Sequence, residues 1–375
     1  MMLKVNINID LFKKILNLHP QKISDLYSKF NKLGYWLDGR DKPTYNQLGQ
    51  VANILNIPFG YFFLSELPEE IYPIPHYRKV STQKFEPSNE LKDTVKILQT
   101  RQMWVKDVLL DYSHSILPFV GCITLDTDIK IAVNSIKKHL RLIDFKAKEF
   151  SNWQDTYIYL INQVEKAGIF VVINGVVGNN THRKLDVNEF RGFVLTDNIA
   201  PFVFINNRDA KSAQIFTLAH EIAHIWLGKS ASFELRNMEA SDNHIEIFCN
   251  KVAAELLVPE EELIQLYLIQ KDFEKLAQYF KVSKLVIARR LLDLQQISKE
   301  SFFEFYNYNY NKEYAKSKDS GGDFYNVVPY RISKRFGEII FRAAKEGIIS
   351  YREAFKLTDL KANTFDKYFK AYKSL

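Results

Sequence analysis

Hydrophobic residues recur along this chain with two different periods. Three long segments place them three and four positions apart, the spacing of one face of a helix: 89–112, 128–141 and 152–168. The pattern then changes to short runs rich in β-branched and aromatic residues and bounded by Gly, Asn and Asp: 169–175, 190–197 and 201–207. The first pattern predicts amphipathic helices. The second predicts strands, with a loop at 176–189 between the first two.

Further helical segments follow the strands. An apolar run predicts a helix that has Asp209 as its N-cap and Gly228 as its stop. The next helix is expected to end before Pro259. Two later segments are helical by the same periodicity: 274–294, which has the shape of two helices joined by a turn, and 331–360.

The N-terminal part of the chain has the pattern of short helices joined by polar turns. Two sets of apolar residues carry the helical spacing: Leu26, Phe30, Leu33 and Leu37, and then Leu48, Val51, Ala52 and Leu55. The run GRDKP separates the two sets, and Thr44 is a suitable N-cap for the second helix. Residues 67–80 contain three prolines, which predicts an extended linker.

Composition narrows the class of protein. A chain of 375 residues with 46% hydrophobic and 25% charged residues predicts a globular protein of two or three domains. Its two cysteines, Cys122 and Cys249, cannot form a disulfide framework and indicate a reducing compartment. The N-terminus lacks a secretory hydrophobic region, and no apolar run approaches the roughly 20 residues that span a bilayer. We therefore expect a soluble cytoplasmic protein without a membrane partner.

Positive charge is concentrated near the two ends. The formal net charge is +7, with eight Lys and Arg against four Asp and Glu in residues 1–60, and fourteen against eight in residues 312–375. Basic ends around a nearly neutral middle suit an anionic partner such as DNA. Solvated helix faces explain each end equally well.

The run FTLAHEIAHIWLG, at 216–228, carries the clearest chemistry. His220 and His224 lie one helical turn apart on one face, so their ring nitrogens can point at the same metal ion. Glu221, next to the first histidine, is placed to act as general base on a water that the metal activates. This H-E-x-x-H pattern is the zincin motif, and it predicts a zinc site with Glu221 as the catalytic residue.

Two histidines leave the predicted site incomplete, because a catalytic zinc usually takes three protein ligands and keeps a fourth position open. Glu246 on the following helix is our candidate for the third ligand, and Asn250 and Ala254 share its face. Four other residues compete for this role: Glu239, Asp242, His244 and Glu255. Of these, Glu255 lies on a different face and is expected to face solvent or to support the site from behind.

These segments together resemble the ImmA/IrrE family of zinc-dependent metallopeptidases. That family pairs an A-H-E-x-x-H helix with a later E-x-x-A-N-x-F-A-A-E-L-L-x-P helix, and the present chain has EIFCNKVAAELLVP at 246–259. Cys249 and Val252 replace the family's Ala and Phe, and both remain apolar. The resemblance covers roughly residues 165–265 and implies Glu246 as the third ligand.

The resemblance also implies a function. Family members cleave repressor or antitoxin proteins, often encoded beside them, and some members with a repressor-like head act as antitoxins of a cognate toxin. We expect zinc as the cofactor and a co-encoded regulator as the substrate. The substrate is expected to pair with an exposed strand edge, for which PFVFIN at 201–206 is the candidate. The group that stabilises the oxyanion stays open, as does a homodimer.

The N-terminal segment resembles the helix-turn-helix heads of phage repressors, through WLDGRDKPT at 36–44. ISDLYSKFNKLGYW at 23–36 would then be the helix that enters the major groove of double-stranded DNA. Its candidate contacts are Ser28, Lys29, Asn31 and Lys32. The alternative is a helical head that grips a protein or forms a dimer.

Two other segments have a structural and a nucleic-acid interpretation. The helix-turn-helix pattern at 274–294 favours a scaffold over a second DNA reader. The aromatic run FYNYNYN at 305–311 favours an irregular connector over a surface that stacks on bases.

The sequence therefore predicts an α+β protein in which a small sheet and the H-E-x-x-H helix form a zincin-like peptidase core between helical ends. The expected parts are a helix-turn-helix-like domain at 1–66, a linker and connecting helix at 67–120, the zinc peptidase domain at 121–268, a helix-turn-helix-like region at 269–311, and a basic helical region at 312–375. Two functions remain open. One is a zinc endopeptidase that cleaves a partner regulator, and the other is a DNA-binding regulator or antitoxin that uses the zinc fold to bind a partner.

Overall fold

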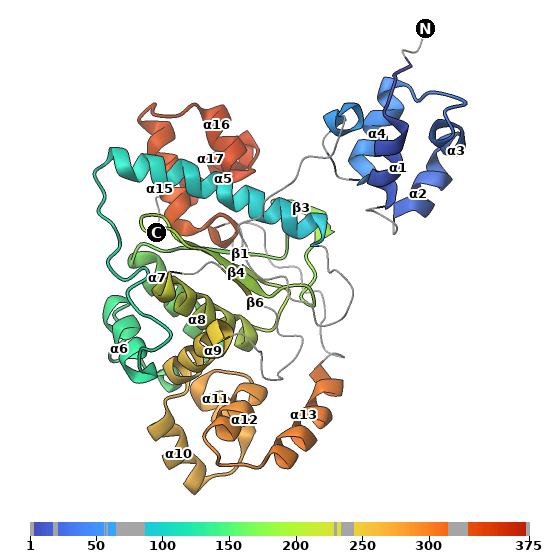
Figure 1. Cartoon of the computed structure of the whole chain (residues 1–375). Helices are drawn as coiled ribbons and strands as arrows, with labels where there is room; N and C mark the ends of the chain where they lie inside the picture. Colours follow the sequence, from blue (N-terminus) through green and yellow to red (C-terminus); the bar gives the residue numbers. More distant parts are fainter. Residues whose placement is uncertain are drawn as a thin grey trace. The chain divides into compact units, whose positions relative to one another are not determined.

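The computed structural model of the chain divides into two compact units, Met1–Ile71 and Tyr72–Leu375 (Figure 1). The residues that it describes are 4–17, 22–55, 57, 59–64, 87–228, 231–233, 244–313 and 329–372. Among them, no helix combines the length and the apolar character that crossing a membrane requires. The two units are described separately below.

The first unit is a small helical domain. Its elements are α1 (Ile9–Asn17), α2 (Ile23–Lys29), α3 (Leu33–Leu37), α4 (Tyr45–Leu55) and the 3-10 helix η2 (Phe59–Phe63). Phe12 and Phe62 meet edge to face in its core, with ring centroids 5.3 Å apart. The predicted N-cap of α4 is confirmed, because Thr44 Oγ1 accepts from Gln47 N while Gln47 Oε1 accepts from Thr44 N.

One long helix over 23–36 was predicted in this unit, and that prediction is wrong. The chain leaves the helical conformation at Phe30, where φ is −125° and ψ is 88°, and α3 begins only at Leu33. The break lets the buried Phe30 ring pack against Trp36, with centroids 5.5 Å apart. Apolar spacing did not reveal the break, because the apolar residues before and after it keep the three- and four-residue spacing of a helix.

A four-stranded sheet lies at the centre of the second unit. Its strands are β1 (Phe170–Asn174), β4 (Gly192–Leu195), β5 (Phe202–Asn206) and β6 (Ala231–Phe233), in the order β1-β5-β4-β6. The pair β1 and β5 is parallel, whereas β4 runs antiparallel to both β5 and β6. The three predicted strands are confirmed, and β6 is an addition to them.

The segment predicted as a loop between the first two strands contains a hairpin instead. Its strands, β2 (Val176–Val177) and β3 (Asn180–Lys184), form a separate two-stranded sheet. Most of the side chains of β3 are exposed. Because neither face of this hairpin is clearly apolar, its strands lack the alternation that marks a half-buried strand in a sequence.

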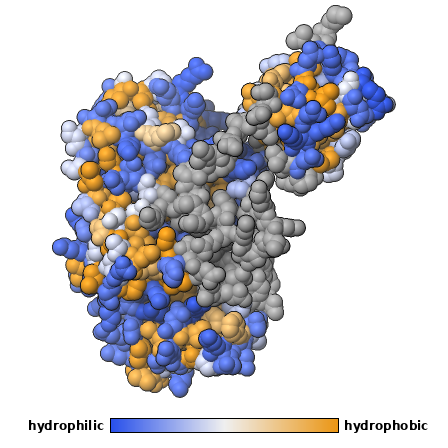
Figure 2. Space-filling model, viewed as in Figure 1, coloured by the Kyte–Doolittle hydropathy of each residue, from blue (hydrophilic) through white to orange (hydrophobic). Residues whose placement is uncertain are grey.

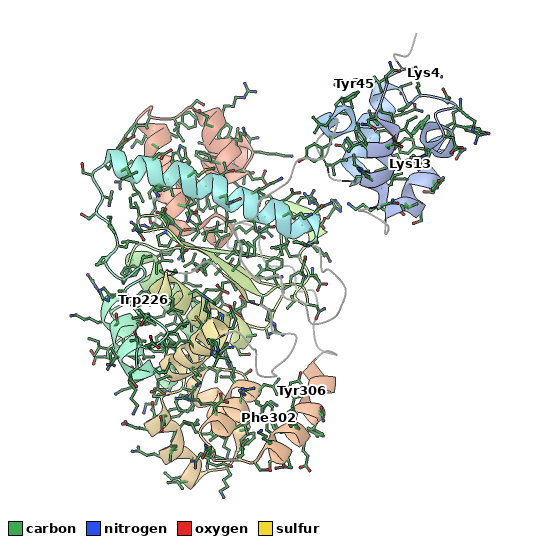
Figure 3. All side chains as sticks on the ribbon, viewed as in Figure 1. Lys4, Lys13, Tyr45, Trp226, Phe302 and Tyr306 are labelled. Carbon is green, nitrogen blue, oxygen red and sulfur yellow. The ribbon has the colours of Figure 1, made fainter. Side chains whose placement is uncertain are left out.

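Helices cover both faces of the sheet, and alternate strand residues divide between them. The near face, which includes Val171, Val203 and Ile205, packs against helices on one side. These are α6 (Ile129–His139), α7 (Trp153–Lys166), α8 (Lys211–Leu227) and α9 (His244–Leu257). Trp226 of α8 stacks on Phe119 in this core, with centroids 4.4 Å apart (Figure 3).

The far face of the sheet is strongly aromatic. Phe170 stacks on Phe202 and Phe193 on Phe204, with centroids 4.7 and 5.1 Å apart. The elements that pack on it are α5 (Asn89–Asp111), α15 (Lys334–Lys345), α16 (Tyr351–Thr358) and α17 (Ala362–Tyr372). The C-terminal helices therefore share one core with the sheet rather than forming a separate layer.

Four more helices follow α9: α10 (Glu260–Ile269), α11 (Phe273–Phe280), α12 (Lys284–Asp293) and α13 (Lys299–Glu313). The turn between α11 and α12 confirms the helix-turn-helix pattern of that segment. The aromatic run at 305–311 lies in α13, so an irregular connector there was wrong. Phe302 is buried and stacks on Tyr306 one turn later, which explains part of the aromatic spacing (Figure 3).

Hydrophobic and hydrophilic residues are interspersed over the surface of the second unit seen in Figure 2. The most exposed large apolar side chains of α10 are Leu268 and Ile269, at 75% and 84%. None of the residues that the structure describes covers them.

Candidate metal centre

The helix α8 carries the histidine motif through the middle of the near-face core. Residues Leu218 to Leu227 are buried on all sides, as expected of a helix that is apolar around most of its circumference. Gly228, with φ of 68°, ends the helix as predicted. The predicted N-cap is wrong by one residue, because Ala210 occupies that position. Asp209 instead pairs with Arg191 Nη1 at 2.8 Å and fixes the turn before the helix.

The structure brings His220, His224 and Glu246 together. The two Nε2 atoms of the histidines lie 3.0 Å apart. The carboxylate of Glu246, from the first turn of α9, lies 3.1 Å from His220 Nε2 through Oε2 and 3.4 Å from His224 Nε2 through Oε1. One ligand atom from each residue thus forms a compact triangle inside the protein.

This triangle has the dimensions of a zinc site. Ligand atoms about 2 Å from a tetrahedral zinc lie roughly 3.3 Å from one another. The two histidine Nε2 atoms lie 3.0 Å apart, and they lie 3.1 and 3.4 Å from the two oxygens of the Glu246 carboxylate, one from each. His224 Nδ1 and Glu246 Oε1 are buried without a hydrogen bond to any described residue. The donor set and its spacing therefore fit a divalent metal such as zinc.

Charge around the triangle leads to the same conclusion. Both carboxylate oxygens of Glu221 are buried and accept no hydrogen bond from the described residues. Burial, and then the nearby Glu246, raises the pKa of Glu221 well above its usual range. Burial also acts to raise the pKa of Glu246, but its contacts with His220 and His224 outweigh this and hold the pKa low. Within the described part of the chain, no Lys or Arg forms an ion pair with either glutamate, so a bound cation would supply the missing positive charge.

Asn250 supports one of the two histidines. It lies one helical turn after Glu246 on α9, and its Oδ1 accepts from His220 Nδ1 at 3.0 Å. An imidazole that donates from Nδ1 keeps the lone pair of Nε2 for a metal. The sequence placed Asn250 on the face of Glu246 without giving it this role, and their i, i+4 spacing was the signal available.

Gly192 makes room for the carboxylate of Glu221. A Cβ atom at Gly192 would lie 2.6 Å from Thr217 Cγ2, 2.8 Å from the Phe204 carbonyl oxygen and 3.3 Å from Glu221 Oε1. Gly192 shares the near face of β4 with Val194, and this face packs against α8. Any side chain here would crowd the helix that carries Glu221. No pattern in the sequence indicated this role, because the contact between β4 and α8 is tertiary.

Comparison with known protein families identifies the same part of the chain. Residues 164–292 match the family model of the IrrE N-terminal-like domain, which belongs to a peptidase family. The match supports the ImmA/IrrE family. It includes α8 and α9, and therefore all the residues of the triangle. Members of this peptidase family are typically metal-dependent.

A second match and one negative result complete the comparison. Residues 332–371 match a domain of unknown function, DUF8813. This segment contains α15, α16 and α17 on the far face of the sheet. No curated protein matches the chain.

The competing candidates for the third ligand fall into three groups. Of the two expectations for Glu255, a solvent-facing position is wrong, because Glu255 is buried and pairs with Arg290 of α12. The reason is that α12 covers the end of α9. His244 is exposed at the start of α9 and is not part of the triangle. Glu239 and Asp242 lie outside the described residues.

The strand edge predicted for the substrate is wrong. PFVFIN contains β5, and this strand is hydrogen-bonded to β1 on one side and to β4 on the other. It has no free edge. Among the described strands of this sheet, β1 and β6 are the outer ones, and β6 contacts α8.

The predicted DNA contacts of the first unit lie at and after the end of α2. Ser28 Oγ donates to the carbonyl of Asp25 at 2.8 Å, and Lys32 Nζ pairs with Asp41 at 3.3 Å. Lys29 and Asn31 are exposed. Local partners thus occupy two of the four side chains, and DNA contact by this set remains a prediction.

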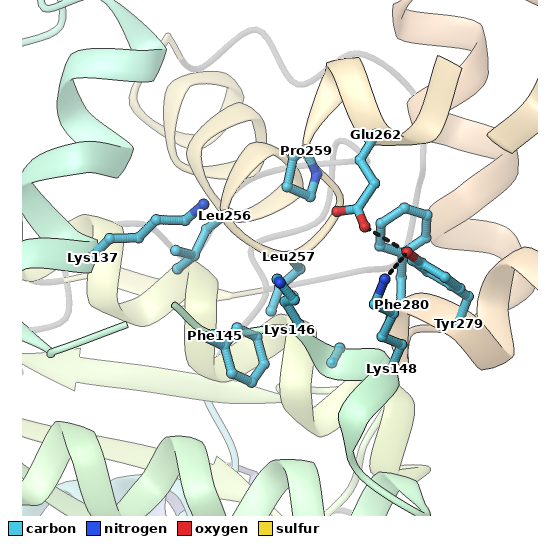
Figure 4. Close-up of a pocket in the computed structure, with 11 residues that line it drawn as sticks. Lys137, Phe145, Lys146, Lys148, Leu256, Leu257, Pro259, Glu262, Tyr279 and Phe280 are labelled. Carbon is cyan, nitrogen blue, oxygen red and sulfur yellow. Dashed lines mark hydrogen bonds between the residues drawn. The ribbon is translucent and has the colours of Figure 1, made fainter. Parts of the chain in front are cut away.

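A partly open pocket lies away from the triangle (Figure 4). It has about 320 Å³ of empty space, part of it open to solvent, near the ends of α6, α9 and α11 and the 3-10 helix η3 (Ala147–Glu149). Lys148 Nζ donates to Tyr279 Oη, which donates to Glu262 Oε1 (Figure 4). Leu256 in its wall lies ten residues after Glu246, about 15 Å along the helix. The candidate metal centre is therefore separate from this pocket.

Proposed function

We propose that this protein is a zinc-dependent endopeptidase that cleaves a partner regulatory protein, a repressor or an antitoxin. The observation that carries the proposal is the buried triangle of His220, His224 and Glu246 with the carboxylate of Glu221 beside it. The match to a peptidase family over the same helices supports it. A zinc ion held by the triangle would supply a Lewis acid that polarises a scissile carbonyl group.

The residues of the chain would divide the remaining work among them. His220, His224 and Glu246 would hold the metal, and Asn250 would orient His220. Glu221 would take a proton from the attacking water and pass it to the leaving amine. Its raised pKa suits this task, because a carboxyl group that binds a proton more readily can carry it between the two steps.

The substrate would bind as an extended segment along β6 by β-augmentation. This outer strand takes the place of the edge that we first assigned to β5, and it contacts the helix that carries Glu221. The zincin-like core would correspond to residues 121–268, with helical regions at 1–66, 67–120, 269–311 and 312–375 around it. The free thiols of Cys122 and Cys249 suit a cytoplasmic location.

The test uses the full-length chain and the protein encoded by the neighbouring gene. We expect the wild-type protein to cleave it, and Glu221→Gln to retain zinc while cleavage falls by about 10²–10⁴-fold. Glu221→Gln keeps the shape of the side chain and removes the base. Cleavage that survives in this variant with zinc bound would exclude Glu221 as the general base.

The charge of the first unit favours a second candidate, a DNA-binding regulator or antitoxin. Residues 1–60 carry eight basic and four acidic residues, and Lys29 is exposed. Under this alternative, cellular activity would survive Glu221→Gln but would be lost when Lys29 and Lys32 are replaced by Ala. If cellular activity is instead lost in Glu221→Gln and kept when Lys29 and Lys32 are replaced, the peptidase proposal is favoured over this alternative.

A further inference from the structure

Positive charge is concentrated in the segment that runs from the last turn of α6 into η3. Residues 137–148 contain five Lys or Arg and a single acidic residue, Asp144. The five cationic residues are Lys137, Lys138, Arg141, Lys146 and Lys148. Five positive charges less one negative charge leave +4, against +7 for the whole chain. We call these five residues, together with Ile143, the α6–η3 surface.

Most of these cations have no partner within the protein. Lys148 Nζ donates to Tyr279 Oη at 3.0 Å, whereas the other four side chains form no hydrogen bond or ion pair with the residues that the structure describes. Two acidic groups at the start of α10 are engaged elsewhere, since Glu261 pairs with Lys130 and Glu262 accepts from Tyr279. The described part of the chain therefore leaves this positive charge uncompensated.

The helix dipole explains only part of the pattern. Lys137 and Lys138 lie in the last turn of α6, where positive charge stabilises a helix. This effect is confined to the last turn, and Lys146 lies well beyond the end of α6. Local stabilisation of α6 therefore does not account for the whole set of cations.

The fold brings the two ends of this segment to one place. Lys137 of α6 and the lysines at η3, Lys146 and Lys148, line the same shallow pocket (Figure 4). Lys146 and Lys148 are exposed, and Lys137 is half-buried. The cations thus lie around an open part of the surface, where an extended partner can reach several of them at once.

An exposed apolar side chain belongs to the same segment. Ile143 lies between Arg141 and Lys146 in the sequence and is 70% exposed. The phosphate backbone of a nucleic acid offers charge but no apolar group to such a side chain, whereas a peptide can cover it and remove it from water. Cations around an exposed isoleucine therefore favour an acidic peptide over a nucleic acid.

We propose that the α6–η3 surface binds an acidic segment of a partner protein, with carboxylates against its lysines and an apolar side chain against Ile143. Exposed charge pairs are weak one at a time, so several must act together, and their complementary charge also speeds the encounter. The helix α6 packs against α9, which carries Glu246, so the partner would lie beside the helix that supplies a corner of the triangle. The binding itself needs neither metal nor cleavage and does not depend on the proposed peptidase activity.

Fluorescence anisotropy with the full-length protein tests the proposal. The probe is a short fluorescein-labelled peptide of glutamates around one leucine. The triple variant Lys137→Gln, Lys138→Gln, Lys146→Gln should bind it about tenfold more weakly than the wild type, because three exposed charge pairs are lost. Arg at the same three positions keeps the charge and should keep the affinity, which supplies the comparison if the Gln variant does not fold.

A matched control removes the same charge from the C-terminal region. Lys345, Lys356 and Lys361 are exposed and have no partner among the described residues. Their joint replacement by Gln should change the affinity for the peptide by less than about twofold, since salt screens charges that are far from the binding surface. Equal losses in the two triple variants would overturn the proposal, because only the net charge of the protein would then matter.

Two further probes separate the contributions and the classes of partner. A peptide with Gly in place of the leucine should bind about threefold more weakly, and equal binding would overturn the role of Ile143. If binding of a DNA duplex falls more than binding of the peptide in the Lys137, Lys138 and Lys146 variant, the surface binds nucleic acid and the proposal is overturned. It is overturned as well if the wild-type protein does not bind the acidic peptide.

Discussion

The two faces of the central sheet bury opposite kinds of charge. On the near face, the buried Glu221 and the partly buried Glu246 lie beside two histidines, and no described Lys or Arg pairs with them. On the far face, Arg101 lies buried with carbonyl groups as its hydrogen-bond partners. The near face departs from the rule that buried charges are paired, and its uncompensated carboxylates lead us to infer a divalent cation there. The far face instead surrounds its buried cation with neutral carbonyl acceptors.

The near-face cluster and the surroundings of Arg101 differ in which segments of the chain supply their residues. The near-face residues belong to two consecutive helices, with His220 and His224 one turn apart. The far-face residues come from α5, the hairpin and the C-terminal segment. Local periodicity can reveal the first arrangement, whereas only the assembled fold reveals the second.

The largest expected effect is the loss of the metal. Glu246→Ala removes one corner of the triangle, so zinc should fall from about one ion per chain to none, because two histidines do not complete a site. Cys249→Ala is the matched control on α9, since Cys249 is buried near these groups but is not a ligand in the triangle. Metal analysis of the purified proteins measures both. Retention of zinc by Glu246→Ala would contradict the inferred cation site.

A smaller effect follows from creating an unpaired charge where the protein now has a pair. Arg290→Met leaves the buried carboxylate of Glu255 without its partner, and we expect the free energy of unfolding to fall by about 3–5 kcal/mol. Arg289→Met changes the adjacent residue of α12, which pairs with Asp293 at the surface, and should cost below about 1 kcal/mol. Urea unfolding compares the two. If both variants lose the same free energy of unfolding, breaking the buried pair costs no more than breaking the surface pair.

The pH dependence of stability tests a buried carboxyl group at the end of α7. Burial raises the pKa of Glu165 to about 7 from 4.5, although Ser333 Oγ donates to it and lowers the pKa in part. The folded protein then binds the proton more tightly than the unfolded chain. Its contribution to the free energy of unfolding is therefore complete below about pH 4.5 and declines by up to about 3 kcal/mol as the pH rises through 7.

Glu165→Gln should remove this decline. Urea unfolding of the metal-free protein between pH 5.5 and 8, on the order of one measurement per half unit, compares the variant with the wild type. Glu274→Gln serves as the control, because Glu274 is exposed. If the free energy of unfolding falls with pH equally in the wild type and Glu165→Gln, the carboxyl group of Glu165 does not cause the decline.

The smallest expected effect concerns the room that Gly192 leaves for Glu221. Gly192→Ala should displace the carboxylate and lower the rate of cleavage about tenfold, equivalent to about 1.4 kcal/mol, while zinc stays bound. Gly337→Ala is a matched control: its Cβ would also be crowded, at 3.2 Å from Tyr368 Oη, but on the far face. That variant should lose stability without a specific loss of activity. Full cleavage by Gly192→Ala would refute this positioning role.

Much of the near face could be predicted from the sequence. The i, i+4 histidines and the later Glu246 predicted a site that the structure assembles, because helical periodicity places these residues without knowledge of the fold. Errors appeared where tertiary contacts override local pattern. The helix expected over 23–36 breaks at Phe30 so that its ring can pack on Trp36. The substrate edge expected at β5 is covered by two neighbouring strands.

The sequence by itself determined the α+β class, three of the four strands of the central sheet, and the two histidines of the triangle. These features depend on spacing within single helices and strands, which a linear pattern records. Only the tertiary structure decided the strand order, the approach of Glu246 to the two histidines, the pairing of Glu255 with Arg290 and the space at Gly192. Each of these depends on side chains from separate segments meeting in space, and no spacing along the chain specifies such a contact.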